Sequence, residues 1–247
     1  MLADFAENYS FVVQDKHKAT TGTNNSAFYI QLLCMQMTVI KFVKPLLCFI
    51  SDDLSHDTGF VYALQKVLSG YVQSHLPHIQ NMECFSDGCS GQYKNYKNFL
   101  NLTYHKHDFD VNASWVFLPR VMESRHVMAP VACWSENWLR KFNANKHLWT
   151  AKSVFKFCEE PIHGITKFFH PGKEHLIPVC ASLTQRFATG NTIPGTRSFH
   201  HFTPDSVGRL MFKRTSQDNA CCGTHSFFKP QFLACTYDNQ WWIGLVE

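Results

Sequence analysis

One apolar run followed at once by an amphipathic segment places the strongest constraint on how this chain folds. Residues 46–51 (LLCFIS) form a short apolar run of the kind that makes a buried strand. Residues 57–74 carry apolar side chains at helical spacing: Phe60, Leu64, Val67, Leu68 and Tyr71. This spacing predicts an amphipathic helix that packs on a core.

The same alternation continues along the chain. The sequence predicts a strand over residues 79–86, a helix over 92–105, a strand over 114–118 and a helix over 151–158. Alternating strands and helices favour an α/β domain over an all-α or all-β one. From Thr189 onward, Gly, Pro and short aromatic runs replace the helical pattern, so this tail is predicted to be loop and β-structure.

Composition narrows the class of protein. The 247 residues are 45% hydrophobic and 17% charged, which is enough for one sizeable core with a small appendage. No apolar run approaches the roughly 20 residues that span a bilayer, and the start MLADFAENYS lacks the pattern of a secretory signal. We therefore expect an intracellular protein with no membrane partner, located in the nucleus if it acts on DNA.

Cysteines and net charge constrain the partners only loosely. The ten cysteines are unevenly spaced, so we expect thiols in a reducing compartment and no disulfide partner. The formal net charge of +4 permits a polyanionic partner such as DNA without requiring one.

Five aspartates are candidates for metal-dependent chemistry: Asp4, Asp52, Asp53, Asp57 and Asp87. Two-metal phosphoryl transfer needs carboxylates from separate strands to converge on Mg²⁺, which prefers oxygen ligands. Asp4 and Asp87 stand at strand ends and fit this need. The alternative is ordinary turn or cap chemistry for Asp4 and Asp87, with Asp52 or Asp53 as the N-cap of the helix that follows, which Asp57 is also expected to cap or flank.

A zinc site is a rival use of nearby side chains. Cys84, Cys89, His105 and His107 form a set of four donors. Zinc modules usually carry tightly paired cysteines and histidines, so the spacing here is poor. A Cys/His hydrolase lacks support, since no nucleophile-elbow pattern is present.

The segment SGQYKNYKN indicates a surface for nucleic acid. Gln92, Tyr93, Lys94 and Lys97 combine cationic, amide and aromatic groups at a predicted helix start, a mixture suited to phosphate and base contacts. The alternative is a solvated helix face.

Five stretches resemble a family of uncharacterised, mainly invertebrate proteins that look derived from transposable elements. They are DFAENYSFVVQD (4–15), FISDDLSHDT (49–58), FSDGCSGQYKN (85–95), IPGTRSFHHF (193–202) and CTYDNQWWIGLVE (235–247). The family's DFAENY and FSDG acids, and a later CDG, resemble the acids of an RNase H-like DDE transposase or integrase core. The resemblance implies that Asp4 and Asp87 are catalytic residues and ligands of Mg²⁺.

The third acid of that pattern is missing. Residues 117–132 read FLPRVMESRHVMAPVA, which does not resemble the family motif FATSHGKxPCDGxGG. Codons can be chosen for residues 118–129 that, when read in a frame beginning at the third base of each codon, translate as ATSHGKSPCDG. In that shifted frame, the codon of the third acid spans Val127 and Met128. Residues 22–48 give a second shifted reading that resembles the family's aromatic-rich HPVVVYY strand. We therefore interpret the chain as a frame-shifted copy.

These readings predict a degraded RNase H-like α/β domain over residues 1–185, disrupted at about 16–48 and 118–151. A small β-rich segment over 186–247 is expected to be an incomplete, truncated barrel. The expected function is a remnant of Mg²⁺-dependent DNA strand cleavage and transfer, without catalysis as written. The alternative is a non-enzymatic nucleic-acid-binding or protein-interaction remnant.

The last stretch predicts a hairpin. A turn at Asp238-Asn239 precedes Trp241 and Trp242, and alternating side chains follow. We expect this strand to pair back onto residues 226–236 or to remain exposed.

Overall fold

The structure is a computed structural model that describes residues 2–5, 9–12, 27–36, 46–51, 57–118, 151–157, 167–169, 173–228, 231–237 and 240–246. The strands are β1 (Leu2–Phe5), β2 (Tyr9–Val12), β3 (Ala27–Gln36), β4 (Leu46–Ser51), β5 (Asn81–Ser86), β6 (Asn112–Phe117), β7 (Lys167–Phe169), β8 (His201–Ser206), β9 (Arg209–Lys213), β10 (Gly223–Ser226), β11 (Gln231–Tyr237) and β12 (Gln240–Val246). The helices are α1 (Thr58–His75), α2 (Tyr96–Thr103), α3 (His105–Phe109), α6 (Ala151–Phe157), α7 (Lys173–Ala188) and the 3-10 helix η1 (Thr196–Ser198).

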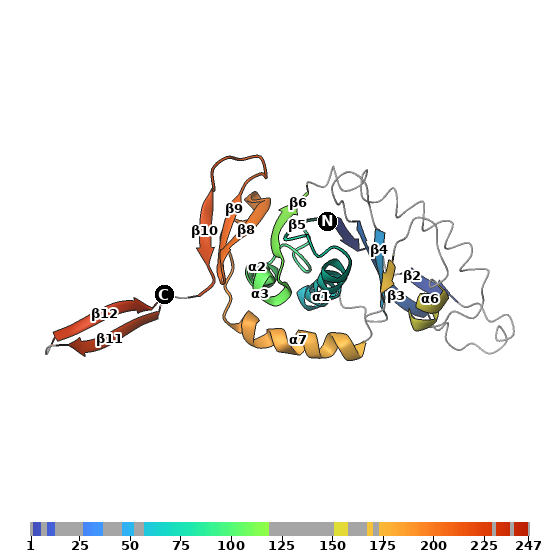
Figure 1. Cartoon of the computed structure of the whole chain (residues 1–247), viewed down its shortest axis with the longest axis horizontal. Helices are drawn as coiled ribbons and strands as arrows, with labels where there is room; N and C mark the ends of the chain where they lie inside the picture. The colour runs from blue at the N-terminus through green and yellow to red at the C-terminus, as the bar shows by residue number, and fades with distance from the viewer. Residues whose placement is uncertain are drawn as a thin grey trace.

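A mixed sheet organises the chain, in the order β10-β9-β8-β6-β5-β1-β3-β4-β7, and β2 pairs with β3. The strand β3 runs antiparallel to both β1 and β4, whereas β1, β5 and β6 run parallel to one another. Figure 1 shows α1, α2 and α3 on one side of this sheet, with α7 crossing below them. The prediction of an α/β fold is therefore confirmed at this level.

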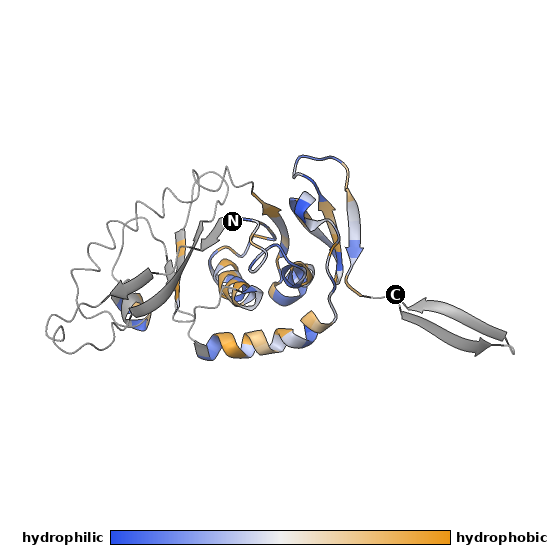
Figure 2. Ribbon diagram, turned by 180° about the vertical axis from the view of Figure 1, so that it is seen from behind, coloured by the Kyte–Doolittle hydropathy of each residue, from blue (hydrophilic) through white to orange (hydrophobic). Residues whose placement is uncertain are grey.

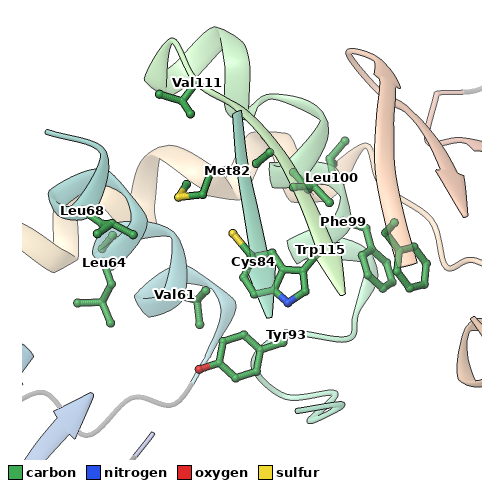
Figure 3. Close-up of a cluster of buried hydrophobic side chains, with 14 of the residues drawn as sticks. Val61, Leu64, Leu68, Met82, Cys84, Tyr93, Phe99, Leu100, Val111 and Trp115 are labelled. Atoms are coloured by element: carbon green, nitrogen blue, oxygen red, sulfur yellow. The ribbon is translucent and has the colours of Figure 1, made fainter. Parts of the chain in front are cut away.

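The core lies between α1 and the parallel strands. Along β5 the buried side chains alternate, so that Met82 and Cys84 face the helices. Figure 3 shows these two side chains with Trp115 of β6, opposite Leu64 of α1. Trp115 is 1% exposed, and its indole nitrogen donates a hydrogen bond of 2.9 Å to Ser86 Oγ. Figure 2 shows hydrophobic and hydrophilic residues mixed along α1 and α7, as expected of helices that bury one face.

Local capping decides where the first two helices begin. The carboxylate of Asp57 accepts a hydrogen bond of 2.8 Å from the backbone nitrogen of Phe60, so Asp57 is the N-cap of α1. The prediction of Asp52 or Asp53 as this cap is therefore wrong, and both residues lie outside the described ranges. The side chain of Asn95 caps α2 in the same way, and for this reason residues 92–95 precede the helix rather than begin it.

Residues of the predicted tail extend the main sheet. Strand β8 pairs antiparallel with β6, and β9 and β10 continue from it. The buried ring of Phe202 holds this edge in place, since it stacks on Phe99 of α2 at 4.3 Å and meets Phe117 of β6 edge-on at 5.5 Å. The boundary drawn at 185/186 falls inside α7, while the division into two domains stays a prediction.

The hairpin at the end of the described chain is confirmed. Strands β11 and β12 pair antiparallel from Gln231↔Val246 to Tyr237↔Gln240 and form a two-stranded sheet of their own. The predicted turn residues Asp238 and Asn239 lie outside the described ranges. The segment 16–48 contributes β3 to the sheet, whereas most of the segment 118–151 is outside the described ranges.

Candidate functional site

The candidate acids lie in, or directly after, two neighbouring parallel strands. Leu2 of β1 pairs with Phe85 of β5, and Asp4 and Asp87 each lie two residues further along the chain from this pair. Asp4 is part of β1, and Asp87 directly follows the last residue of β5. The carboxyl ends of parallel strands meet at one edge of a sheet, which is where side chains from separate strands can share a ligand. The side chain of Asp4 lies outside the description, so the separation of the two carboxylates stays a prediction.

Asp87 also makes a local turn. Its Oδ1 accepts a hydrogen bond of 3.2 Å from the backbone nitrogen of Cys89, and its carbonyl accepts one of 3.0 Å from Ser86 Oγ. This is the turn chemistry expected of an aspartate before glycine. Within the described residues no hydrogen bond involves Oδ2 of Asp87. One carboxylate oxygen therefore fixes the loop, while the other is available to a hard cation such as Mg²⁺.

Lys94 lies along the same loop. A Cβ placed on Gly88 would be 3.7 Å from Lys94 Cδ, so the lysine stem runs beside the residue that follows Asp87. Its ammonium lies 5.2 Å from the centre of the Phe117 ring and donates a hydrogen bond of 3.4 Å to the carbonyl of Arg197. Partial burial lowers the pKa of Lys94 below its usual range. These contacts hold Lys94 at the carboxyl end of β6.

The other three residues predicted to contact nucleic acid lie in different surroundings. Tyr93 is only 2% exposed and packs its ring against Trp115 at 5.7 Å, as Figure 3 also shows. The prediction that Tyr93 contacts bases is therefore wrong, since its ring belongs to the core. Gln92 is half-buried, and its carbonyl accepts a hydrogen bond of 3.2 Å from Thr58. Lys97 is exposed and lies 5.5 Å over the Phe187 ring of α7, away from Lys94.

A groove of about 350 Å³ lies between the start of α1, the start of α2 and α7. Its polar lining includes Thr58 and Asn95, whose side chains hydrogen-bond to each other at 2.9 Å. Lys97 and Phe187 line it from the other side. Both helix starts already have side-chain caps, so their first backbone amides are partly satisfied.

The four predicted zinc donors differ in their burial and in the groups that they contact. Cys84 is fully buried, and burial raises the pKa of its thiol to about 12, whereas Cys89 is exposed. His105 is 1% exposed and its Nδ1 lies 2.6 Å from the carbonyl of Val111, while His107 contacts Asp108. No group of three or more potential metal ligands occurs in the part of the chain that the structure describes. Five cysteines in these ranges are free thiols: Cys84, Cys89, Cys180, Cys221 and Cys222.

Sequence reasoning missed an ion pair that fastens α7 to the other helices. Arg186 donates to the two carboxylate oxygens of Asp108 at 2.7 and 3.1 Å, and the Tyr62 hydroxyl donates to one of them at 2.9 Å. Burial raises the pKa of Asp108, but hydrogen bonds from Arg186, His107 and Tyr62 outweigh it and leave that pKa below its usual range. Burial followed by the Asp108 hydrogen bond raises the pKa of Tyr62 to about 12.

The chain is a mixed α/β protein in which Asp4 lies in β1 and Asp87 follows the neighbouring strand β5. The chain is a member of the family described as a domain of unknown function, DUF8701, whose model matches residues 1–216 and so covers most of the 247 residues. The searches of curated proteins and of solved structures returned no match. Within the described ranges, no helix is both long and apolar enough to cross a bilayer.

Proposed function

We propose that the chain is the remnant of a Mg²⁺-dependent DNA strand-cleavage and transfer protein of the RNase H-like DDE class. Its retained metal ligands are Asp4 and Asp87, and it does not catalyse cleavage. The observation that carries the proposal is the parallel pairing of Leu2 in β1 with Phe85 in β5, because β1 contains Asp4 and β5 directly precedes Asp87.

The topology around the two acids supports the proposal. The middle strands run in the order β4-β3-β1-β5-β6, with the first three antiparallel and the last three parallel. Helix α1 connects β4 to β5, and α2 with α3 connects β5 to β6. This order of three antiparallel strands followed by two parallel crossovers agrees with an RNase H-like core. The resemblance of five stretches to proteins derived from transposable elements agrees with it as well.

The expected lack of activity follows from the third acid. In-line displacement needs metal ions held at fixed positions, and a site with two carboxylates loses part of that geometry. The residues where the third acid should stand lie within 119–150, outside the described ranges. Two other acids in this segment, Glu123 and Glu136, are the candidates to replace it.

A plasmid-nicking assay tests the proposal. Supercoiled DNA is incubated with the purified chain in Mg²⁺ and in Mn²⁺, and with a variant carrying Asp87→Asn as the control. We expect no nicking above background for either protein. Nicking by the original chain that disappears in Asp87→Asn would contradict the proposed inactivity, and would then be repeated with Glu123→Gln and Glu136→Gln to find the third ligand.

A non-enzymatic nucleic-acid-binding protein is the second candidate. It is favoured by Lys94, whose stem runs beside Gly88, and by the exposed Arg197, because no carboxylate in the described residues forms an ion pair with either. DNA affinity that falls with salt and survives Asp87→Asn separates this candidate from one that binds DNA only through a metal.

A further inference from the structure

The side chain of Lys94 contacts the backbone of Arg197, from a distant part of the chain, near the sheet edge that carries Asp87. Lys94 belongs to the loop after β5, and Arg197 belongs to η1, yet the Lys94 ammonium lies 3.4 Å from the Arg197 carbonyl. The Arg197 side chain is exposed and Lys94 is half-buried. We infer that Lys94 and Arg197 form a phosphate-binding patch that holds the DNA backbone beside Asp87. This inference deepens the proposed function and rests on it.

The segment that carries Arg197 is fastened to the core. Gly190 lies so close to α2 that an added Cβ would be 2.8 Å from the Tyr96 ring. Gly195 adopts a left-handed backbone with φ of 68°, which favours glycine and lets the chain turn into η1. The Thr196 hydroxyl then donates to the carbonyl of Ile193. A cation on a fixed segment loses little freedom when it binds an anion.

The same segment joins the end of β6. The backbone nitrogen of Phe117 donates to the carbonyl of His200 at 2.8 Å, and His200 Nδ1 lies 3.2 Å from the Phe117 carbonyl. Leu118, the next residue, donates from its backbone nitrogen to the carbonyl of Ser86 at 2.9 Å. Hydrogen bonds thus connect the residue before Asp87, the end of β6 and the segment of Arg197. The patch and the acid therefore belong to one edge.

Carboxylates neutralise some of the cations in the described residues, and Lys94 and Arg197 are not among these. In the described residues, Lys106 pairs with Asp110 at 2.7 Å, Arg186 with Asp108 at 2.7 Å and Arg209 with Asp205 at 3.2 Å. No such pair includes Lys94 or Arg197 in those same ranges. A phosphodiester backbone supplies anionic oxygens at regular spacing and suits cationic residues that neighbouring segments present at one edge.

Salt-dependent DNA binding tests the patch. Fluorescence anisotropy of a labelled 20-base-pair DNA is measured in EDTA over a series of salt concentrations, for the full chain, Lys94→Gln, Arg197→Gln and Arg197→Lys. Each lost phosphate contact should lower the slope of log affinity against log salt by about one, and Arg197→Lys should restore most of it. The matched control is Lys106→Gln, which removes the same charge from α3, at the opposite end of β6.

Any of four outcomes would overturn the patch. They are no DNA binding by the full chain, an unchanged slope in both Lys94→Gln and Arg197→Gln, an equal loss in Lys106→Gln, and displacement of the DNA by poly-glutamate at an equal concentration of charge. The last outcome would show that the surface does not select phosphate over carboxylate. Circular dichroism confirms that each variant is folded.

A measurement in Mg²⁺ separates the patch from the proposed function. If Asp87→Asn abolishes a Mg²⁺-dependent gain in DNA affinity and leaves the slope in EDTA unchanged, both stand. If Mg²⁺ has no effect while Arg197→Gln still lowers the slope, the metal site fails and the patch survives as a binding surface. If the Mg²⁺ effect depends on Asp87 and Arg197→Gln leaves the salt slope unchanged, the patch alone fails.

Discussion

His105 is a buried imidazole with one satisfied nitrogen. Its Nδ1 lies 2.6 Å from the Val111 carbonyl, and because a carbonyl only accepts, this nitrogen carries the proton. The buried Nε2 has no hydrogen-bond partner in the described residues, and the ring meets Phe109 edge-on at 4.9 Å. Burial lowers the pKa of His105 below 6.5, and the Val111 hydrogen bond and the Asp108 charge only partly oppose this.

The shift predicts acid sensitivity. The neutral ring is stable in the folded chain above the unfolded pKa of about 6.5. The free energy of unfolding should therefore fall as pH drops below that value and on toward the lower folded pKa. Urea unfolding at pH 7.5, 6.5 and 5.5 should show a smaller pH dependence for His105→Gln than for the original chain. His75→Gln, at an exposed histidine, is the control, and an equal dependence in the two variants would refute the assignment.

At the scale of single elements, capping residues determine where the helices begin. Asp57→Ala removes the acceptor for the backbone nitrogen of Phe60 and should lower the free energy of unfolding by about 1 kcal/mol. Asp57→Asn keeps an acceptor and should lose far less. Chemical denaturation measures both, and an equal loss would mean that the charge of Asp57, rather than its hydrogen bond, stabilises the start of α1.

The elements that the sequence predicted correctly are those with a clear pattern of apolar residues along the chain. The helix over 57–74 and the strand over 46–51 agree with α1 and β4, because their apolar periodicity is clear. Helix α7 went unpredicted, since Pro178 lies inside it and its attachment depends on Arg186 and Asp108, which are 78 residues apart. The start of α2 was predicted too early, at residue 92, because the apolar pattern does not show that the side chain of Asn95 caps the helix.

Long-range contacts decide the arrangement of the whole molecule. The sequence predicted Asp4 and Asp87 at strand ends, and in the structure β1 pairs with β5 through Leu2 and Phe85. It did not predict that β8 to β10 extend the same sheet, because the stack of Phe99, Phe117 and Phe202 joins residues about a hundred positions apart. Nor did it place Arg197 beside Lys94. The tertiary contact between η1 and the loop after β5 is needed to see that pair.

The central claim is that Asp4 and Asp87 together hold a divalent metal. Its most direct measurement is anomalous diffraction from a crystal of the chain soaked in Mn²⁺, which stands in for Mg²⁺ and is visible by its anomalous signal. We expect a peak within ligand distance of both carboxylates, which disappears in Asp87→Asn. Carboxylates more than about 10 Å apart, beyond the roughly 4 Å separation of two metals plus ligand reach, would contradict it.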